Sequence, residues 1–206
     1  MALWMVLYLE GLSLFAVYMC PNVALNMNTF SVIVDLEATC CDQNSFARDE
    51  MEIIEVGAVR VSRVTGEVES EFEAFVKPVR NPNLTDFCTK LTTISQQDVD
   101  EAELFPVVNE RFKLWLEEEP DYDFCSWGGY DKNQFKRDCD YHKVSYPFTG
   151  SHRNLKEEFS ASLRTKKRFG LGSAIRNLGF QFEGTSHRGI DDARNIARVY
   201  KNLLNL

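Results

Sequence analysis

Two acidic side chains, Asp35 and Glu37, follow an apolar stretch of the chain and are spaced by two residues. Residues 31–34, a serine and three β-branched residues, have the composition of a buried strand, along which successive side chains alternate between two faces. Both carboxylates are therefore expected on one face, where they repel each other and need a cation. The alternative is a strand that frays into solvent and carries two ordinary surface acids. Partners from elsewhere in the chain decide between these interpretations.

Asp131 is one candidate partner. It follows an apolar segment, 122–127, and a pair of glycines. Ligand-binding groups gather at the carboxyl ends of strands in open α/β sheets, which would place Asp131 beside Asp35. An aspartate near a helix start is also commonly a cap or a partner of the helix dipole. Both interpretations of Asp131 remain open from its position alone.

A second candidate group is His187 with Asp191 and Asp192, at the start of an expected helix. Adjacent helical residues point about 100° apart, so one acid can face a site while the other caps the helix or meets solvent. A single histidine in such a loop is often structural. His142 and His152 have no comparable acidic neighbours, and we interpret them as structural or surface residues.

The strands that would position these residues come early in the chain. Residues 42–50 are polar and predict a loop. Residues 52–64 predict a β-strand in which Gly57 indicates a bulge, and after a Thr-Gly turn residues 67–76 return as a third strand. Together with the first strand, these segments predict an antiparallel meander. Residues 122–127 predict a further strand.

Helices are expected over most of the remaining chain. The clearest apolar periodicity lies in 104–117 and 190–204. Shorter helices are expected over 86–91, 95–99, 130–142, 155–163 and 171–178. Three strands, then helices, a strand and more helices predict one α/β domain whose first three strands are antiparallel.

Size and charge restrict the class of protein. The chain has 206 residues, 44% hydrophobic and 26% charged, as is typical of a soluble globular domain. The net charge of −8 is uneven: residues 1–130 hold 8 Lys and Arg against 23 Asp and Glu, whereas residues 131–206 hold 15 against 8. A basic carboxyl-terminal part suits an anionic ligand bound locally rather than a protein that coats long stretches of nucleic acid.

The cysteines and the first residues bear on the cellular setting. The six cysteines form no C-x-x-C pair and have no histidine at zinc spacing, which favours reduced thiols in an intracellular protein. Residues 1–27 are mostly apolar, but Glu10 interrupts them and no basic residue precedes Arg48. We expect them to be a leader or extension outside a domain that covers 28–206, without stable membrane association.

The order of the candidate residues resembles that of the DEDDh 3′→5′ exonucleases. Asp35-x-Glu37 is followed after about 95 residues by Asp131, and after about 60 more by His187 with Asp192 five residues on. Other stretches are similar to the enhanced-RNAi and histone-mRNA 3′-exonuclease branch, namely 35–40, 52–55, 75–78, 84–88, 91–94 and 191–198. The resemblance covers about residues 30–204. It implies an RNase H-like exonuclease fold, with a five-stranded mixed sheet flanked by helices.

The resemblance also implies the roles of the catalytic residues, which are Asp35, Glu37, Asp131, His187 and Asp192. The four carboxylates would hold two Mg²⁺ ions, or Mn²⁺ in their place, because an all-oxygen ligand set selects these ions over zinc. Asp35 would bridge both ions in a two-metal mechanism. His187 would be the general base, since an unperturbed histidine pKa of about 6.5 suits proton transfer at neutral pH.

Substrate contacts are implied in the same way. The terminal nucleotide would be held by Leu36, Glu37, Ala38, Thr39, Leu91, Ile94 and His187. Bases would be held by stacking, so weak sequence preference is expected. Trp127 could stack as well, or belong to the core. The basic residues that could follow the phosphate backbone are Lys132, Arg164, Lys166, Lys167, Arg168 and Arg188, with a solvated loop as the alternative for 164–168.

The sequence therefore predicts a cytoplasmic, metal-dependent exonuclease that releases 5′-mononucleotides from single-stranded 3′ ends, with RNA favoured over DNA. One alternative is a DNA proofreading or repair exonuclease on the same fold. Another is a non-catalytic regulatory protein that binds nucleic acid or another protein through this domain. A scaffold has no need of five clustered catalytic positions, which favours an enzyme.

Overall fold

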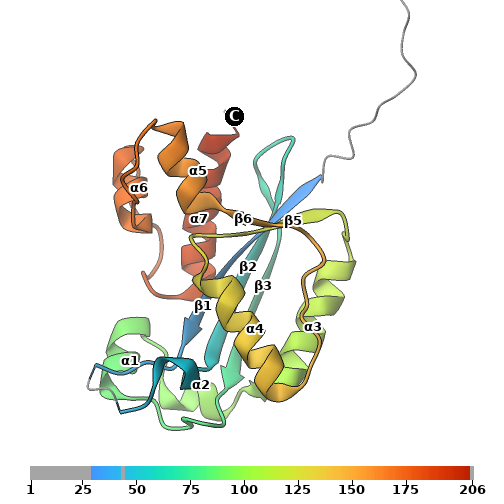
Figure 1. Cartoon of the computed structure of the whole chain (residues 1–206), viewed down its shortest axis with the longest axis vertical. Helices are drawn as coiled ribbons and strands as arrows, with labels where there is room; N and C mark the ends of the chain where they lie inside the picture. The colour runs from blue at the N-terminus through green and yellow to red at the C-terminus, as the bar shows by residue number, and fades with distance from the viewer. Residues whose placement is uncertain (1–28, 43–44, 205–206) are drawn as a thin grey trace, which may run out of the picture.

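A six-stranded mixed sheet forms the centre of the computed structural model, which describes residues 29–42 and 45–204 (Figure 1). The strand order is β4-β3-β2-β1-β5-β6. The antiparallel meander consists, as predicted, of β1 (Phe30–Ala38), β2 (Ile53–Ser62) and β3 (Val68–Lys77). The strand β5 (Tyr122–Ser126) pairs parallel with β1.

The sheet has six strands where five were expected. Two of them, β4 (Glu103–Leu104) and β6 (His152–Asn154), pair parallel with β3 and β5 and were not located in the sequence. Segments of two or three residues are too short to show the alternation by which a strand is recognised. The antiparallel start of the sheet and its mixed character are confirmed.

The helices lie close to the predicted segments. They are α1 (Asp86–Thr92), α2 (Gln96–Asp100), α3 (Phe105–Glu117), α4 (Tyr130–His142), α5 (Leu155–Ser162), α6 (Leu171–Asn177) and α7 (Gly189–Leu203). The predicted loop 42–50 contains a single turn of 3₁₀ helix, η1 (Arg48–Glu50). Thr85 caps α1, because its side chain accepts a hydrogen bond from the Cys88 amide.

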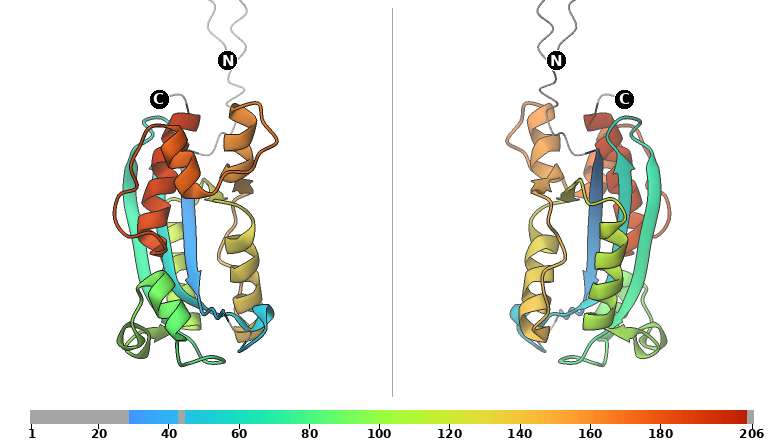
Figure 2. Two further views of the ribbon diagram at one scale, coloured as in Figure 1. Left: turned by 90° about the vertical axis from the view of Figure 1, so that its left-hand side faces the viewer. Right: turned by 90° about the vertical axis from the view of Figure 1, so that its right-hand side faces the viewer.

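Helices cover both faces of the sheet. The two views of Figure 2, from opposite sides, have α7 (red) in front in one and α3 (yellow-green) in front in the other. Side chains of β1 alternate accordingly: Val32, Val34 and Leu36 pack with α3 and α4, whereas Ile33 packs with α7. Asp35 and Glu37 have the same parity as Ile33 and therefore point to the α7 face.

Gly57 is where α7 meets the sheet. A Cβ added to Gly57 would lie 2.1 Å from the carbonyl carbon of Gly189, the first residue of α7. The bulge predicted at Gly57 is wrong, because the register of β1 and β2 is regular there and shifts instead between Glu37 and Ala38. The glycine is needed for close backbone approach, which sequence pattern does not distinguish from a bulge.

Replacing Gly57 with alanine is expected to lower the free energy of unfolding by about 3 kcal/mol, because the added methyl would overlap the backbone of α7. Urea unfolding measures the change. Gly170→Ala is the matched control: nothing lies within 4 Å of its added Cβ, and an effect below about 1 kcal/mol is expected, because Gly170 is the N-cap of α6 and alanine is a poorer cap. Equal effects at both positions would contradict the packing described.

Two further observations concern the part of the chain that the structure describes. None of its helices is long and apolar enough to cross a membrane. Five of the cysteines, Cys40, Cys41, Cys88, Cys125 and Cys139, are free thiols there. The predicted leader or extension, 1–27, lies outside the described residues.

Candidate active site

The carboxyl end of β1 carries a cluster of acids. Carboxylate oxygens of Asp35, Glu37 and Asp192 lie within 4.8 Å of one another, close enough to share a metal ion. Asp35 and Glu37 come from one face of β1, as their spacing predicts, and Asp192 comes from the first turn of α7. Glu37 is 9% exposed and Asp192 8% exposed. The alternative of two ordinary surface acids is therefore wrong.

Asp131 joins this cluster from α4. It is 5% exposed, and its Oδ1 accepts a hydrogen bond from the backbone amide of Leu36 at 3.2 Å. Because β5 runs parallel to β1, its carboxyl end delivers the start of α4 to the same edge of the sheet. Asp131 lies outside the group of three that share 4.8 Å, but it lines the same pocket.

His187 and Asp192 are held together at the start of α7. The His187 amide donates a hydrogen bond to Asp192 Oδ2 at 2.6 Å, and His187 has a left-handed backbone with φ of 65°. The His187 side chain is exposed. Asp191 points away and accepts a hydrogen bond from the Thr185 amide at 2.8 Å. The two adjacent acids therefore divide as predicted, with Asp192 facing the site.

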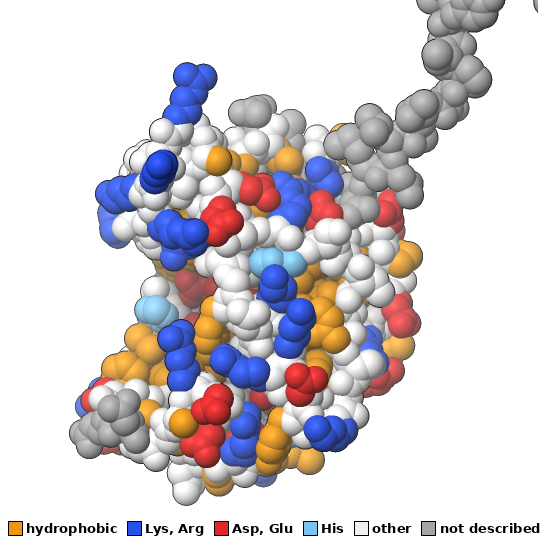
Figure 3. Space-filling model, viewed as in Figure 1, with side chains coloured by type: hydrophobic (Ala, Val, Ile, Leu, Met, Phe, Trp, Pro, Cys, Tyr) orange, Lys and Arg blue, Asp and Glu red, His pale blue; other side chains and the backbone are white. Residues whose placement is uncertain are grey.

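These residues line a cavity of about 330 Å³. In Figure 3 the molecule is hollowed on its left side, between the α5–α6 region above and the α1 region below. The full lining consists of Asp35, Leu36, Glu37, Ala38, Cys40, Met51, Leu91, Trp127, Tyr130, Asp131, Leu171, His187 and Asp192. A lining that combines acids with apolar and aromatic side chains suits a ligand that has both phosphate and base.

The structure places two of the expected nucleotide contacts outside this pocket. Thr39 is 2% exposed, and its Oγ1 accepts a hydrogen bond from the Glu52 amide, which ties the end of β1 to the start of β2. Ile94 is fully buried in a small apolar cluster with Ile54 and Val99. Neither residue lines the pocket. A sequence pattern does not tell which residue of a segment faces a cavity.

Trp127 belongs to the core and also lines the pocket, so stacking on a base stays a prediction. It packs against the apolar clusters beneath α7, its Nε1 donates to the Phe169 carbonyl at 3.1 Å, and its ring lines the pocket. Tyr130 and Leu171 also line the pocket and were missed in the sequence. The position of Tyr130 next to Asp131 in the sequence could have indicated that it lines the pocket. Nothing in the sequence indicates Leu171, because only the fold brings α6 to the pocket.

The residues expected to contact phosphate lie in three different settings. Arg188 is engaged elsewhere, in ion pairs with the fully buried Glu55 at 3.2 Å and with Glu73 at 3.3 Å. Arg168 pairs with Glu157 at 3.0 Å. Lys132 lies in a separate hollow beside His152. The exposed residues Arg164, Lys166 and Lys167 lie between α5 and α6, where Figure 3 shows basic side chains above the hollow.

Burial and mutual repulsion raise the pKa values of all four carboxyls. Burial raises the pKa of Glu37 to about 8 and the pKa values of Asp131 and Asp192 to about 6. The pKa of Asp35 is raised well above its ordinary value by burial and by the charges of Asp131 and Asp192. Divalent cations relieve such repulsion and favour carboxylate oxygens, so the donor set fits Mg²⁺ or Mn²⁺.

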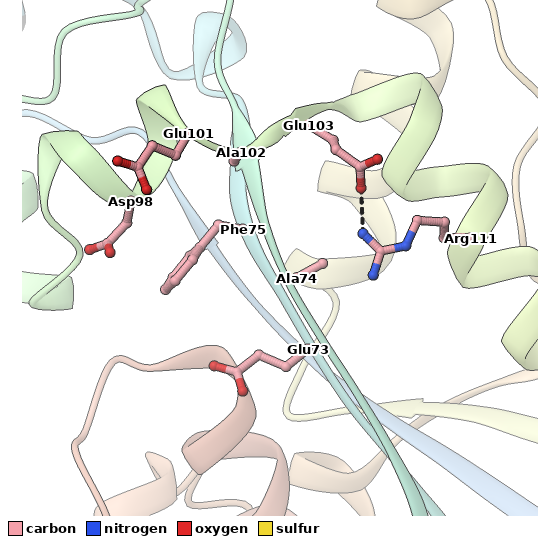
Figure 4. Close-up of a pocket in the computed structure, with 8 residues that line it drawn as sticks. All are labelled: Glu73, Ala74, Phe75, Asp98, Glu101, Ala102, Glu103 and Arg111. Carbon is pink, nitrogen blue, oxygen red and sulfur yellow. Dashed lines mark hydrogen bonds and ion pairs between the residues drawn. The ribbon is translucent and has the colours of Figure 1, made fainter.

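A second hollow, of about 340 Å³, lies along the edge of β3 (Figure 4). It is also acidic, but its acids do not converge. Figure 4 draws Glu103 toward Arg111, to which it is ion-paired, and Glu73 is paired with Arg188. The acids of this hollow are thus partly neutralised by their own neighbours, unlike those at the end of β1.

Comparison with known proteins agrees with this geometry. The family model RNase_T, described as Exonuclease, matches residues 32–200. Human 3'-5' exoribonuclease 1 is 31% identical over 193 residues, which cover 89% of this chain and 54% of the relative. Mouse ERI1 exoribonuclease 2 is 31% identical over 190 residues, covering 82% of this chain and 27% of the relative. The chain thus spans about half or less of the length of these relatives.

Solved structures share the fold. The nuclease domain of 3'hExo, a DEDDh family member bound to rAMP, superposes with a TM-score of 0.81 and 29% sequence identity, over 86% of this chain and 92% of that one. The chain therefore belongs to the RNase_T exonuclease family, in the ERI1-like branch of the DEDDh superfamily.

Proposed function

We propose that this protein is a metal-dependent 3′→5′ exonuclease that removes 5′-mononucleotides from single-stranded 3′ ends. The observation that carries the proposal is the convergence of Asp35, Glu37 and Asp192, with Asp131 and His187 in the same pocket. Acids that repel each other so strongly are costly to bury together unless a cation is part of the function.

Each residue has a defined task in the proposed reaction. Asp35, Glu37 and Asp192 would hold divalent metal, with Asp131 alongside. Such ions, when bound, would lower the pKa of the attacking water and stabilise the charge that develops at the phosphodiester. His187, an exposed residue that lines the pocket, would accept a proton from the attacking water at a ring nitrogen.

The apolar and aromatic residues that line the pocket would hold the terminal nucleoside. Leu36, Leu91 and Trp127 offer surfaces for the base and ribose, while the exposed segment 164–168 offers positive charge to the upstream phosphates. Contacts of this kind read no base edge, so cleavage with weak sequence preference follows from the proposal.

RNA is the favoured substrate. The support is similarity to proteins named exoribonucleases and to a nuclease domain bound to rAMP. The chain covers only part of these relatives, so its own substrate preference has to be measured. Parallel assays of single-stranded RNA, single-stranded DNA and duplexes with 3′ overhangs measure it. Faster cleavage of DNA would favour the repair alternative, and tight binding without cleavage would favour the regulatory one.

The cellular setting and the extent of the domain are also proposals. Five free thiols among the described residues support a reducing compartment such as the cytoplasm. The family model lies within the proposed domain, 28–206, and its match begins beyond the proposed leader or extension.

A free 3′ end should be required. An RNA with a 3′-hydroxyl is expected to be shortened stepwise, whereas a circular RNA of the same sequence should stay intact and a 3′-phosphate should slow cleavage at least about tenfold, because a phosphate adds bulk and charge beside the acids of the pocket. Gel analysis of 5′-labelled substrate, with the labelled circle as control, measures this. Rapid cutting of the circle would indicate an endonuclease.

A further inference from the structure

Glu55 is a fully buried carboxylate beside the active site. It lies directly opposite Glu37 in the pairing of β2 with β1, so both side chains share one face of the sheet. Two residues further along β2, Gly57 lies opposite Asp35. The two metal-facing acids of β1 therefore each have a neighbour on β2, one acidic and one without a side chain.

The start of α7 rests on these two neighbours. Gly189 is packed between the strands: a Cβ added to it would lie 2.9 Å from the Asp35 carbonyl oxygen and 3.5 Å from the Glu55 carboxyl carbon. The Gly189 amide donates a hydrogen bond to Glu55 Oε2 at 3.0 Å. Amides in the first turn of a helix have no partner within the helix, so Glu55 both satisfies and locates this end of α7.

Arg188 completes the attachment. Its Nε donates to Glu55 Oε2 at 3.2 Å, its Nη2 pairs with Glu73 at 3.3 Å, and its guanidinium lies 5.0 Å above the Phe75 ring. Glu73 lies at the wall of the hollow shown in Figure 4. The arginine is thus held between a buried and a half-exposed acid on β2 and β3.

His187 and Asp192 flank this attachment in the chain. His187 immediately precedes Arg188, and its amide is bonded to Asp192. We infer that Glu55 is a positioning residue of the active site, which holds Arg188 and Gly189 so that the general base and the metal-holding acid of α7 face the acids of β1. This inference rests on the proposed function for the roles of His187 and Asp192.

Glu52 offers a matched control three residues away. It is 2% exposed, and its carboxylate accepts hydrogen bonds from the backbone amides of Val79, Arg80 and Asn81 at 2.7 to 3.0 Å. Both glutamates are therefore buried acids on β2 or its approach that accept from several donors. They differ in what they hold, since Glu52 fixes the segment after β3 and Glu55 fixes α7.

The experiment compares Glu55→Gln with Glu52→Gln in the full chain. A carboxylate has two acceptor oxygens, whereas a glutamine amide has one. In either variant the new NH₂ group must therefore face a group that donated a hydrogen bond to the glutamate, and similar losses of Tm are expected. Glu55→Gln alone should lower kcat about 10²-fold, with KM within about threefold, because it displaces groups that act on the reacting atoms rather than on the nucleoside. Glu55→Asp, which keeps the charge but has a shorter reach, should lose about tenfold.

A second readout does not require catalysis. Calorimetric titration of the substrate-free protein with Mn²⁺ should show affinity about tenfold weaker for Glu55→Gln, because Asp192 moves with α7, and unchanged affinity for Glu52→Gln. An inactive wild-type protein would overturn the proposed function, while the Mn²⁺ titration would still test Glu55. Equal losses in both variants, or wild-type kcat and Mn²⁺ affinity in Glu55→Gln and Glu55→Asp, would overturn the positioning role.

Discussion

Replacement of Asp35 by alanine is expected to lower kcat for 3′-end cleavage by at least about 10³-fold, a size typical of the loss of a central electrostatic contact. Burial is the largest cause of the raised pKa of Asp35, and the nearby charges of Asp131, Asp192 and Glu37 raise this pKa further. Asp35 therefore lies among the other acids of the cluster. The Asp35→Ala variant would lose one of the three carboxylates that could share a metal ion. Single-turnover assays on 5′-labelled RNA measure the loss.

The fold should survive this substitution. A carboxyl whose pKa is raised by burial and by like charges destabilises the folded state when it is ionised, so its removal is expected to leave the Tm of the metal-free protein unchanged or higher. Asp121→Ala, at an exposed aspartate just before β5, is the control and should retain full activity. A loss below tenfold for Asp35→Ala would show that the catalytic site lies elsewhere.

Removing divalent metal with excess EDTA is expected to abolish cleavage, and adding Mg²⁺ or Mn²⁺ in excess of the chelator should restore it. The acids that line the pocket offer oxygen ligands, and no Lys or Arg is among the described residues that line it. The comparison is made on one protein sample before chelation, in EDTA, and after return of the metal. Undiminished degradation in EDTA would exclude the metal-dependent mechanism.

The pH dependence of stability provides a further check on metal removal. Burial and repulsion raise the pKa values of Asp131 and Asp192 to about 6 and that of Glu37 to about 8, whereas the unfolded chain has ordinary values of about 4. At pH values between the unfolded and the folded pKa, the folded protein binds more protons than the unfolded chain. The metal-free protein should therefore lose stability as pH rises from 5 to about 8. Mg²⁺ should raise the Tm more at pH 8 than at pH 6.

Local pattern was sufficient for most of the fold. The alternation along β1 places Asp35 and Glu37 on one face, and the long strands and helices lie within a few residues of their predicted bounds. The short strands β4 and β6 were missed, because two or three residues acquire strand geometry only from a neighbour that pairs with them.

The site was predicted as a set of residue types but not as an arrangement. Asp131 and Asp192 were identified by their order in the chain, and the structure brings them to β1 through the parallel pairing of β5 and the contact between α7 and β2. Thr39 and Ile94 were expected to hold the terminal nucleotide, yet neither lines the pocket. Which side of a segment faces a cavity depends on packing partners that are distant in the sequence.

The sequence by itself determined the chemistry available to this protein: the number of carboxylates, the histidine, and the strand that presents two acids together. Tertiary structure decided which charged side chains line the pocket and which are held in ion pairs elsewhere. Arg188, taken from the sequence as a phosphate contact, is bound to Glu55, and Glu55 holds the helix that carries Asp192. The physical reason is that charge pairing and burial depend on separation in space, which residues more than 130 positions apart acquire only when the chain folds.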